Sequence, residues 1–110
     1  MNLSVVIPNY NGQDLLKKNL PKVFEAIDVY RNGKKEIIVT DDCSLDNSIN
    51  VLQNLKSKME SSYPDTMFKL IENDKNFGFS SNVNKGVANA KGDILILLNT
   101  DVSPKKDFLM

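Results

Sequence analysis

The stretch that decides the fold is Asp93-Ile94-Leu95-Ile96-Leu97-Leu98-Asn99-Thr100-Asp101, near the end of the chain. Its five consecutive apolar residues show no alternation, which is typical of a strand buried on both faces of a parallel sheet. A polar triplet that ends in a carboxylate follows at once. Because ligands of open α/β sheets bind beyond the carboxyl ends of the strands, we expect Asp101 to lie at a ligand-binding edge.

Three further apolar runs precede this one and predict strands at 3–7, 36–40 and 67–72. Helical periodicity between the runs predicts three helices. Their apolar faces carry Leu16, Leu20, Val23 and Ile27; Leu45, Ile49, Leu52 and Leu55 or Met59; and Val83, Val87 and Ala90. Strand and helix therefore alternate at the spacing of βαβ units, which predicts an α/β fold with a parallel sheet of about four strands.

Local residues set the expected ends of these elements. Pro8 is expected to close the first strand, because proline cannot donate to a ladder. Pro21 falls inside the first helical pattern and predicts a kink or a break there. Ser44 and Ser80 are placed to cap the second and third helices. The serine and proline at 103–104 predict the start of another helix.

Composition excludes several classes of function. The 14 basic and 14 acidic residues balance, so no charge excess indicates a nucleic acid partner. One cysteine and no histidine exclude internal disulfides, Cys/His zinc sites and nucleophile pairs that need histidine. No signal-like N-terminus and no apolar run of the roughly 20 residues that span a bilayer are present. We expect a cytoplasmic protein, with the inner face of the membrane as an alternative location for a longer one.

The polar loops at 8–12, 41–44 and 99–101 should meet at the carboxyl edge of the sheet, and 76–84 precedes a helix N-terminus that can face an anion. The ring of Tyr10 can stack on a base, and a carboxylate can accept a ring N–H. One more carboxylate together with phosphate oxygens is the usual way in which Mg²⁺ is held. These residue types together predict a nucleotide-diphosphate site.

Each candidate also has a purely structural interpretation. Asp101 is equally suited to cap the helix that follows it. Asp41 and Asp42 are common turn residues, although two adjacent acids repel and are more often kept for a ligand. Tyr10 can simply cover the sheet edge. Cys43 has no histidine or cationic cluster beside it in the sequence, which favours a small packed side chain over a nucleophile.

Four segments resemble family-2 glycosyltransferases of the GT-A fold. They are Ser-Val-Val-Ile-Pro-Asn-Tyr-Asn at 4–11, Glu-Ile-Ile-Val-Thr-Asp-Asp-Cys-Ser-Leu-Asp-Asn-Ser at 36–48, Asn-Phe-Gly-Phe-Ser-Ser-Asn-Val-Asn-Lys-Gly at 76–86, and Asn-Thr-Asp at 99–101. The segment 76–86 is similar to the rhamnosyltransferase-like branch. The resemblance covers essentially the whole chain and implies a three-layer, Rossmann-like half that binds nucleotide-diphospho-sugars, with strand order 3-2-1-4.

The resemblance further implies inverting transfer of a sugar from a UDP- or dTDP-sugar to a hydroxyl of a glycan or lipid-linked acceptor. In this reading Tyr10 lies against the base, Asp42 accepts the N–H of uracil or thymine, and Asp101 is the ligand of Mg²⁺ or Mn²⁺, with Asn99 as a second, neutral ligand. The other donor-binding residues would be Pro8, Asp41, Ser44, Asn76, Gly78, Asn84 and Thr100. The metal would neutralise the departing pyrophosphate.

Two residues depart from the family pattern. Cys43 stands where glycine is usual, so a strained or shifted turn is expected. Asn99 stands in place of an acid, which leaves one firm anionic ligand and favours a metal shared with the donor phosphates. No residue of the chain maps onto the family's general base. The chain therefore is expected to be the N-terminal, donor-binding part of a catalytic domain, with a naturally short protein as the alternative.

Other functions remain open from the sequence. A receiver-like signalling module also gathers acids at a sheet edge, but its acidic pair follows the first strand, whereas Asp41 and Asp42 follow the second. A nucleotidyltransferase would show a glycine-rich basic loop after the first strand, and Gly12 alone does not supply it. The chain could also bind nucleotide without turnover, or pair with itself along an exposed sheet edge to form a homo-oligomer.

Overall fold

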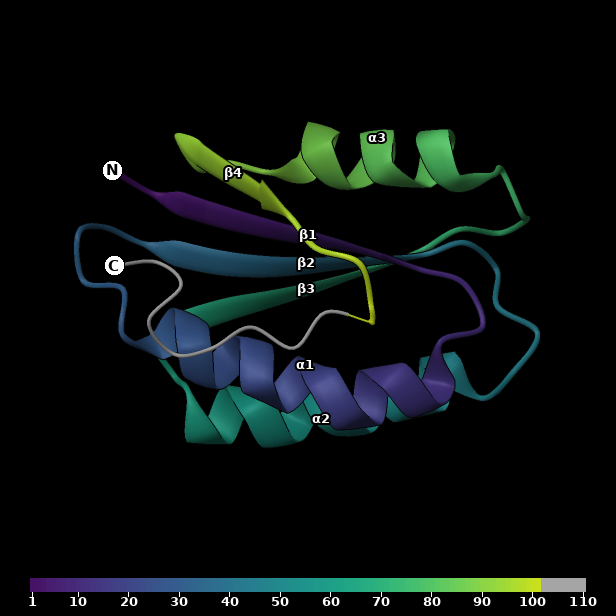
Figure 1. Cartoon of the computed structure of the whole chain (residues 1–110), viewed down its shortest axis with the longest axis horizontal. Helices are drawn as coiled ribbons and strands as arrows, with labels where there is room; N and C mark the ends of the chain where they lie inside the picture. The colour runs from purple at the N-terminus through teal and green to yellow at the C-terminus, as the bar shows by residue number, and fades with distance from the viewer. Residues whose placement is uncertain (102–110) are drawn as a thin grey trace.

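The computed structural model describes residues 1–101, which form a four-stranded parallel sheet with helices on both faces. Its strands are β1 (Leu3–Asn9), β2 (Lys35–Asp41), β3 (Thr66–Glu72) and β4 (Ile94–Leu97), in the order β3-β2-β1-β4 (Figure 1). The α/β class, the parallel sheet and the order 3-2-1-4 are confirmed. A flavodoxin-like receiver sheet has the order 2-1-3-4-5, so the strand order contradicts the receiver-like alternative.

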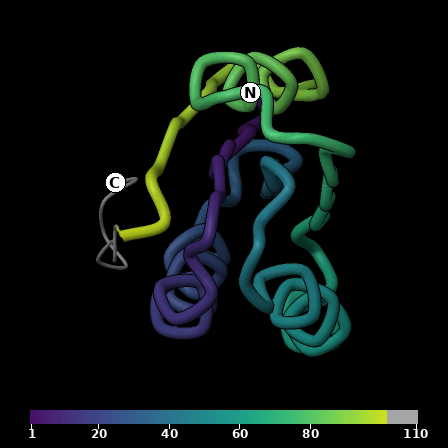
Figure 2. Tube along the Cα trace, turned by 90° about the vertical axis from the view of Figure 1, so that its right-hand side faces the viewer, coloured from purple at the N-terminus to yellow at the C-terminus, as the bar shows by residue number. Residues whose placement is uncertain are grey.

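The helices make the outer layers. Helices α1 (Gln13–Asp28) and α2 (Ser48–Ser62) lie side by side on one face, and α3 (Phe79–Asn89) lies on the other (Figures 1 and 2). The apolar faces of α1 and α2 pack on β1, β2 and β3. The core centres on Val5, Ile7, Leu20, Phe24, Ile27, Ile37, Val39, Leu52 and Phe68. This arrangement leaves the carboxyl ends of β1 and β2 next to each other at the centre of the sheet.

Strand β1 continues through Pro8 to Asn9, so the expectation that Pro8 closes the strand is wrong. Pro8 and Val6 are two residues apart and face the same neighbouring strand. The carbonyl of Val6 accepts the last bond from the β4 side, from Leu98 N–H at 3.0 Å, and the β1–β4 register ends at Val6. Pro8 therefore lies beyond the end of the β1–β4 pairing, where the strand needs no backbone N–H donor.

Helix α1 runs unbroken through Pro21, so the expected break does not occur. Proline removes the bond to the carbonyl of Lys17, whose side chain is exposed to solvent. The same helix buries a continuous apolar face that includes Leu16, Leu20 and Phe24, each at most 2 % exposed. Tertiary burial of that face outweighs the one lost backbone bond.

Strand β4 is a strand as expected but is not buried on both faces. Within residues 1–101 it pairs with β1 only and is an edge of the sheet. Ile94, Leu95 and Leu97 are 37 %, 45 % and 48 % exposed, whereas β1 and β2 are buried throughout. The unbroken apolar run predicted the strand correctly, but its place at the sheet edge and the covering of its faces depend on the rest of the fold.

Helix α2 begins later than expected, at Ser48. Ser44 does not cap it, because its hydroxyl donates to Oδ1 of Asp41 at 2.6 Å. The N-cap is Asn47, which makes no side-chain cap bond, and Asp46 before it accepts the N–H of Ser48 at 2.9 Å. Leu45 precedes the helix and is 83 % exposed, so its assignment to the buried face is also wrong.

Helix α3 meets the sheet with polar and small residues. Ser80 does not cap it, because the helix begins at Phe79 with Gly78 at its N-cap. Its buried residues are Asn82 and Gly86, whereas Val87 is 38 % exposed, so the predicted apolar face is wrong. Gly86 allows a close approach, since a Cβ there would lie 2.4 Å from Cγ1 of Val6.

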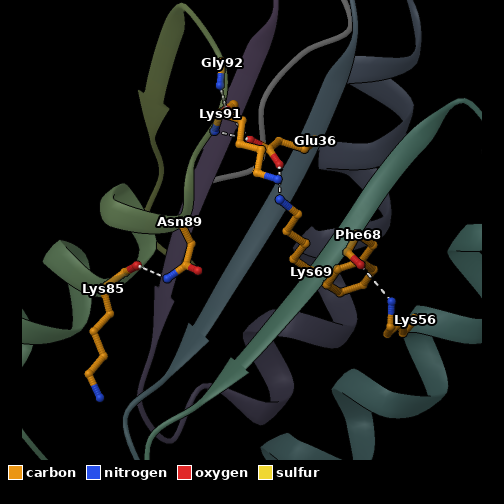
Figure 3. A network of polar contacts seen from close by, with 9 residues as sticks. Glu36, Lys56, Phe68, Lys69, Lys85, Asn89, Lys91 and Gly92 are labelled. Atoms are coloured by element: carbon orange, nitrogen blue, oxygen red, sulfur yellow. Dashed lines mark hydrogen bonds and ion pairs between the residues drawn. The ribbon is translucent and has the colours of Figure 1, made fainter.

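A polar network joins the strands near the amino end of the sheet (Figure 3). The carboxylate of Glu36 pairs with Nζ of Lys69 at 2.8 Å and accepts the backbone N–H of Lys91 at 2.7 Å. The hydroxyl of Ser4 donates to Glu36 at 2.5 Å and accepts the N–H of Gly92 at 2.7 Å. These bonds join β1, β2, β3 and the segment after α3, far from the carboxyl ends of the strands.

The predicted helix start at 103–104 lies outside the described residues. None of the helices within 1–101 is long and apolar enough to cross a membrane.

Candidate functional site

A cavity of about 320 Å³ opens at the carboxyl ends of β1 and β2, beside the N-terminus of α3. Its lining residues are Pro8, Asn9, Tyr10, Asp42, Asn76, Gly78, Phe79 and Asn82. The rings of Tyr10 and Phe79 are 46 % and 63 % exposed. The cavity therefore combines two accessible aromatic rings with one buried carboxylate, at the edge where parallel sheets bind ligands.

The loop after β1 is tied to the loop after β2 by Asp41. The carboxylate of Asp41 accepts bonds from Nδ2 of Asn9 at 2.7 Å, and from the N–H and hydroxyl of Ser44 at 2.9 and 2.6 Å. The hydroxyl of Ser44 in turn accepts the N–H of Asn11 at 2.9 Å. Asp41 is 1 % exposed and does not line the cavity, but it holds Asn9, which does. Its carboxylate therefore stabilises the conformation of the loop after β2 and ties it to the end of β1.

Asp42 is the carboxylate that borders the cavity, although it is only 3 % exposed. Oδ1 accepts Nδ2 of Asn73 and the N–H of Phe77, and Oδ2 accepts the N–H of Gly78, each at 2.9 Å. Burial raises the pKa of Asp42, but these donors and the nearby Lys85 ammonium outweigh it, and the pKa is held below its ordinary value. The carboxylate is therefore ionised at neutral pH.

Two unusual backbone conformations shape the loops. Cys43 has φ +60°, which confirms that its position suits glycine and that the turn carries a strained residue. Gly78 has φ +93° and ψ +165°, a region that residues with a Cβ essentially never adopt. That conformation directs the N–H of Gly78 to Asp42, while the N–H also lies 3.0 Å from Oδ1 of Asn76.

The triplet 99–101 lies on the other side of the β1 loop, against α1. The carbonyl of Thr100 accepts Nδ2 of Asn19 at 2.8 Å, and its Oγ1 would lie 3.2 Å from a Cβ at Gly12. Asn99 and Asp101 are exposed. Among residues 1–101, no three histidine, cysteine or acidic side chains gather closely enough to hold a metal ion unaided.

The structure thus brings most of the predicted residues together. Pro8, Tyr10, Asp42, Asn76 and Gly78 line one cavity. Asp41 and Ser44 do not line it but bond to Asn9, which does. The residues at 99–101 do not line the cavity and lie against α1 instead. Asn84 lies on the exposed surface of α3.

Four further residues of the site were not singled out in the sequence prediction, although three of them fall in the loops 8–12 and 76–84. Phe79 gives the cavity a second exposed aromatic residue, Asn9 and Asn82 line it, and Asn73 donates to Asp42. Asn82 lies one helical turn before Gly86, and these two are the buried residues of α3. The spacing of four residues between an amide and a glycine was a signal for this face, but the apolar pattern of the helix obscured it.

Comparison with known proteins identifies relatives over nearly the whole chain. A family model described as Glycosyl transferase family 2 matches residues 4–110. The dolichol-phosphate mannosyltransferase of Pyrococcus furiosus is 37% identical over 103 residues, which cover 93% of this chain and 26% of that protein. The undecaprenyl-phosphate 4-deoxy-4-formamido-L-arabinose transferase of Edwardsiella ictaluri is 34% identical over 101 residues, 91% of this chain and 29% of that protein. The chain therefore spans less than a third of the length of these relatives.

Solved structures share the same fold. A mannosyltransferase from Pyrobaculum calidifontis, in complex with GDP-Man and Mn²⁺, matches with a TM-score of 0.82 and 25% identity, over 97% of this chain and 30% of that one. S. aureus TarS in complex with UDP-GlcNAc matches with a TM-score of 0.80 and 22% identity, over 99% of this chain and 29% of that one. The second likeness shows the fold alone.

Proposed function

The chain belongs to glycosyl transferase family 2, and on that premise we propose that residues 1–110 form the N-terminal, donor-binding part of a sugar-nucleotide-dependent transferase. The single observation that carries the proposal is the cavity at the carboxyl edge. There the ionised, buried Asp42 lies beside the exposed rings of Tyr10 and Phe79. A ring to stack on and a carboxylate to accept an N–H are what a nucleobase requires.

The number of free acceptor positions on Asp42 favours a uridine or thymidine donor over a guanosine donor. A carboxylate offers about four acceptor positions. Oδ1 of Asp42 already receives two donors and Oδ2 receives one. One position is left, which suits the single ring N–H of uracil or thymine. Guanine presents an N–H and an adjacent amino group and would need two positions.

The residues at 99–101 fit a metal that is shared with the donor. Asp101 is exposed and supplies one carboxylate, and Asn99 supplies a neutral oxygen. Mg²⁺ is commonly held by one or two carboxylates together with substrate phosphates and waters. The proposed Mg²⁺ or Mn²⁺ would neutralise the leaving pyrophosphate, and Asp101 would hold it at the phosphate end of the donor. The solved relative with GDP-Man and Mn²⁺ supports a divalent ion in the family.

The transfer itself is proposed as an inversion at the sugar, with attack by an acceptor hydroxyl. No residue of this chain is assigned as the general base, so the isolated chain is expected to bind the donor without transferring its sugar. The names of two relatives refer to dolichol phosphate and undecaprenyl phosphate, which supports a lipid-linked acceptor, with a glycan as the alternative. The resemblance of 76–86 to the rhamnosyltransferase-like branch supports a hexosyl or deoxyhexosyl donor.

Thermal unfolding with nucleotides tests the proposal. UDP with Mn²⁺ at a hundred times Kd should stabilise the chain by about 2.7 kcal/mol. Asp42→Ala should abolish most of this shift, and Asp101→Ala should abolish the part that depends on the metal. Asp65→Ala, at the opposite end of the sheet, is the matched control and should keep the full shift. An equal shift in all four proteins would refute the assignment, and a larger shift with GDP than with UDP would refute the base preference.

A further inference from the structure

Two buried amides lie behind Asp42 and connect it to the sheet. Nδ2 of Asn73 donates to Oδ1 of Asp42 and to Oδ1 of Asn82, both at 2.9 Å. Nδ2 of Asn82 donates to the backbone carbonyl of Thr40 at 2.9 Å. Asn73 and Asn82 are 6 % and 2 % exposed. The bonds therefore form a buried relay from the β2 backbone, through α3 and the loop after β3, to the carboxylate.

The relay fixes which way each amide points. The carbonyl of Thr40 only accepts, so Asn82 must turn its NH₂ toward it and its oxygen toward Asn73. Asn73 must then present its NH₂ to that oxygen and to Asp42. A rotated Asn73 would put its own oxygen against two other oxygens. The Asp42 carboxylate at one end of the relay and the Thr40 carbonyl at the other, both acceptors, thus require the same orientation of the Asn73 amide.

This orientation determines which oxygen of Asp42 is available. Among residues 1–101, Asn73 and the N–H of Phe77 donate to Oδ1, whereas Oδ2 receives only the N–H of Gly78. We infer that Asn73, oriented by Asn82, is a positioning residue that keeps the Asp42 carboxylate charged and leaves Oδ2 as its ligand-accepting oxygen. The role of Oδ2 toward a base rests on the proposed function, but the effect on the carboxylate does not.

The charged groups near Asp42 do not account alone for its lowered pKa, because the Asn73 donor also contributes. Lys85 on α3 also favours the ionised form of Asp42. Asp41, the neighbouring acid on β2, opposes it. Glu72 and Asp74 flank Asn73 in the chain and are exposed, so water screens them. Burial raises the pKa of Asp42, and the Asn73 donor is one of the groups that lower it. Removing this donor should therefore raise the pKa of Asp42.

The decisive measurement is the pKa of Asp42 from the ¹³C shift of its carboxyl group, in wild type, Asn73→Leu and Asn82→Leu. Leucine keeps the volume and removes the donor. The pKa should rise in both variants, and more in Asn73→Leu. Asn73→Ala, which also removes the donor and adds no bulk, serves if Asn73→Leu fails to fold. Ser4→Ala removes a buried hydrogen-bonded hydroxyl at the amino end of the sheet and is the control for general destabilisation. It should leave this pKa unchanged.

Calorimetric titration with UDP supplies the second readout. Loss of a hydrogen bond to a charged group should weaken UDP binding about tenfold or more in Asn73→Leu. As the pH is lowered, this variant should also lose UDP binding at a higher pH than wild type does. An unchanged pKa of Asp42 in Asn73→Leu or Asn73→Ala would overturn the inference. A raised pKa with unchanged UDP affinity would overturn its ligand-positioning part. Absence of UDP binding in wild type would refute the proposed function instead, and the pKa comparison would still decide the role of Asn73.

Discussion

The backbone N–H of Gly78 donates to Oδ2 of Asp42 at 2.9 Å and joins the loop before α3 to the end of β2. The two residues are 36 positions apart, yet together they form one wall of the cavity. The bond needs the backbone of Gly78 at φ +93°. A residue at one loop thus determines how a carboxylate on another loop is held.

Gly78→Ala is expected to destabilise the chain by about 1–3 kcal/mol, because its backbone conformation is essentially restricted to glycine. Contacts with more distant residues do not add to this cost, since no atom of the described residues beyond its two chain neighbours lies within 4 Å of the position that a Cβ would take. Urea unfolding measures the loss. Ser81→Ala, on the exposed surface of the same helix, should change stability by less than about 0.5 kcal/mol. Equal stability of Gly78→Ala and wild type would show that the loop can relax without cost.

Acid should unfold the chain through carboxylates that the fold keeps ionised. The pKa of Asp42 is lowered, because its hydrogen-bond donors outweigh burial, and the pKa of Glu36 is lowered by Lys69, Lys91 N–H and Ser4 against the same opposing effect of burial. A depressed folded-state pKa contributes stability above the unfolded-state pKa, near 3.8 for Asp42 and 4.5 for Glu36, and this stability is lost as pH falls toward the folded-state value.

Urea unfolding between pH 7 and pH 3 measures this dependence. Wild type should lose stability as the pH falls through the acid range. Glu36→Gln should be less stable at pH 7, and its difference from wild type should shrink in acid, where Glu36 is also neutral. A difference that stays constant with pH would mean that the ionised form of Glu36 has no preference for the folded state.

Cys43→Gly is expected to raise the melting temperature. Cys43 holds φ +60°, which costs a residue with a Cβ roughly 1–2 kcal/mol. Glycine removes this strain but adds freedom to the unfolded chain, worth about 0.4–1 kcal/mol. The net gain should be about 0.5–1 kcal/mol in thermal unfolding. Cys43→Ala keeps the Cβ and should give no such gain, so an equal rise in both variants would contradict the role of backbone strain.

Elements with a strong local signal were predictable from the sequence. The four strands and three helices were found because each carries an apolar run or a helical period, and the loops after β1 and β2 meet as expected. Prediction failed where a distant residue decides the outcome. Pro8 is tolerated in β1 because β4 ends beside it, and Ser44 leaves its expected capping role because Asp41 offers a charged acceptor.

The site shows the same division. Tyr10 and Asp42 follow strands directly, so their meeting at one edge could be predicted. The relay through Asn73 and Asn82 was not predicted. The apolar pattern of α3 obscured the spacing of Asn82 and Gly86, and Asn73 lies in the loop after β3, where no periodicity indicates which side chains are buried. The position of Asp101 could be predicted only in part. It follows a strand, as expected, but the sequence did not reveal that Asp101 does not line the cavity that Asp42 borders.

The packing of α3 on β1 gives the last prediction. Gly86→Ala would improve the intrinsic helix propensity of α3 by about 1 kcal/mol. However, the new Cβ would lie 2.4 Å from Cγ1 of Val6 and 3.1 Å from Cγ2 of Thr40, and Val6 is fully buried. Overpacking of a buried contact typically costs 1–3 kcal/mol, so we expect a net loss of about 1 kcal/mol in urea unfolding.

Val6→Ala removes the methyl group that the new Cβ would strike and therefore separates a steric cause from any other. Alone it should destabilise the chain by leaving a cavity. In that background Gly86→Ala should become neutral or stabilising, since the Cβ then fills vacated space and the helix propensity is retained. The double-mutant cycle should show a coupling of more than about 1 kcal/mol. Additive losses would mean that α3 moves away from β1 as a unit, and UDP binding should then weaken as well, because Asn82 moves with the helix.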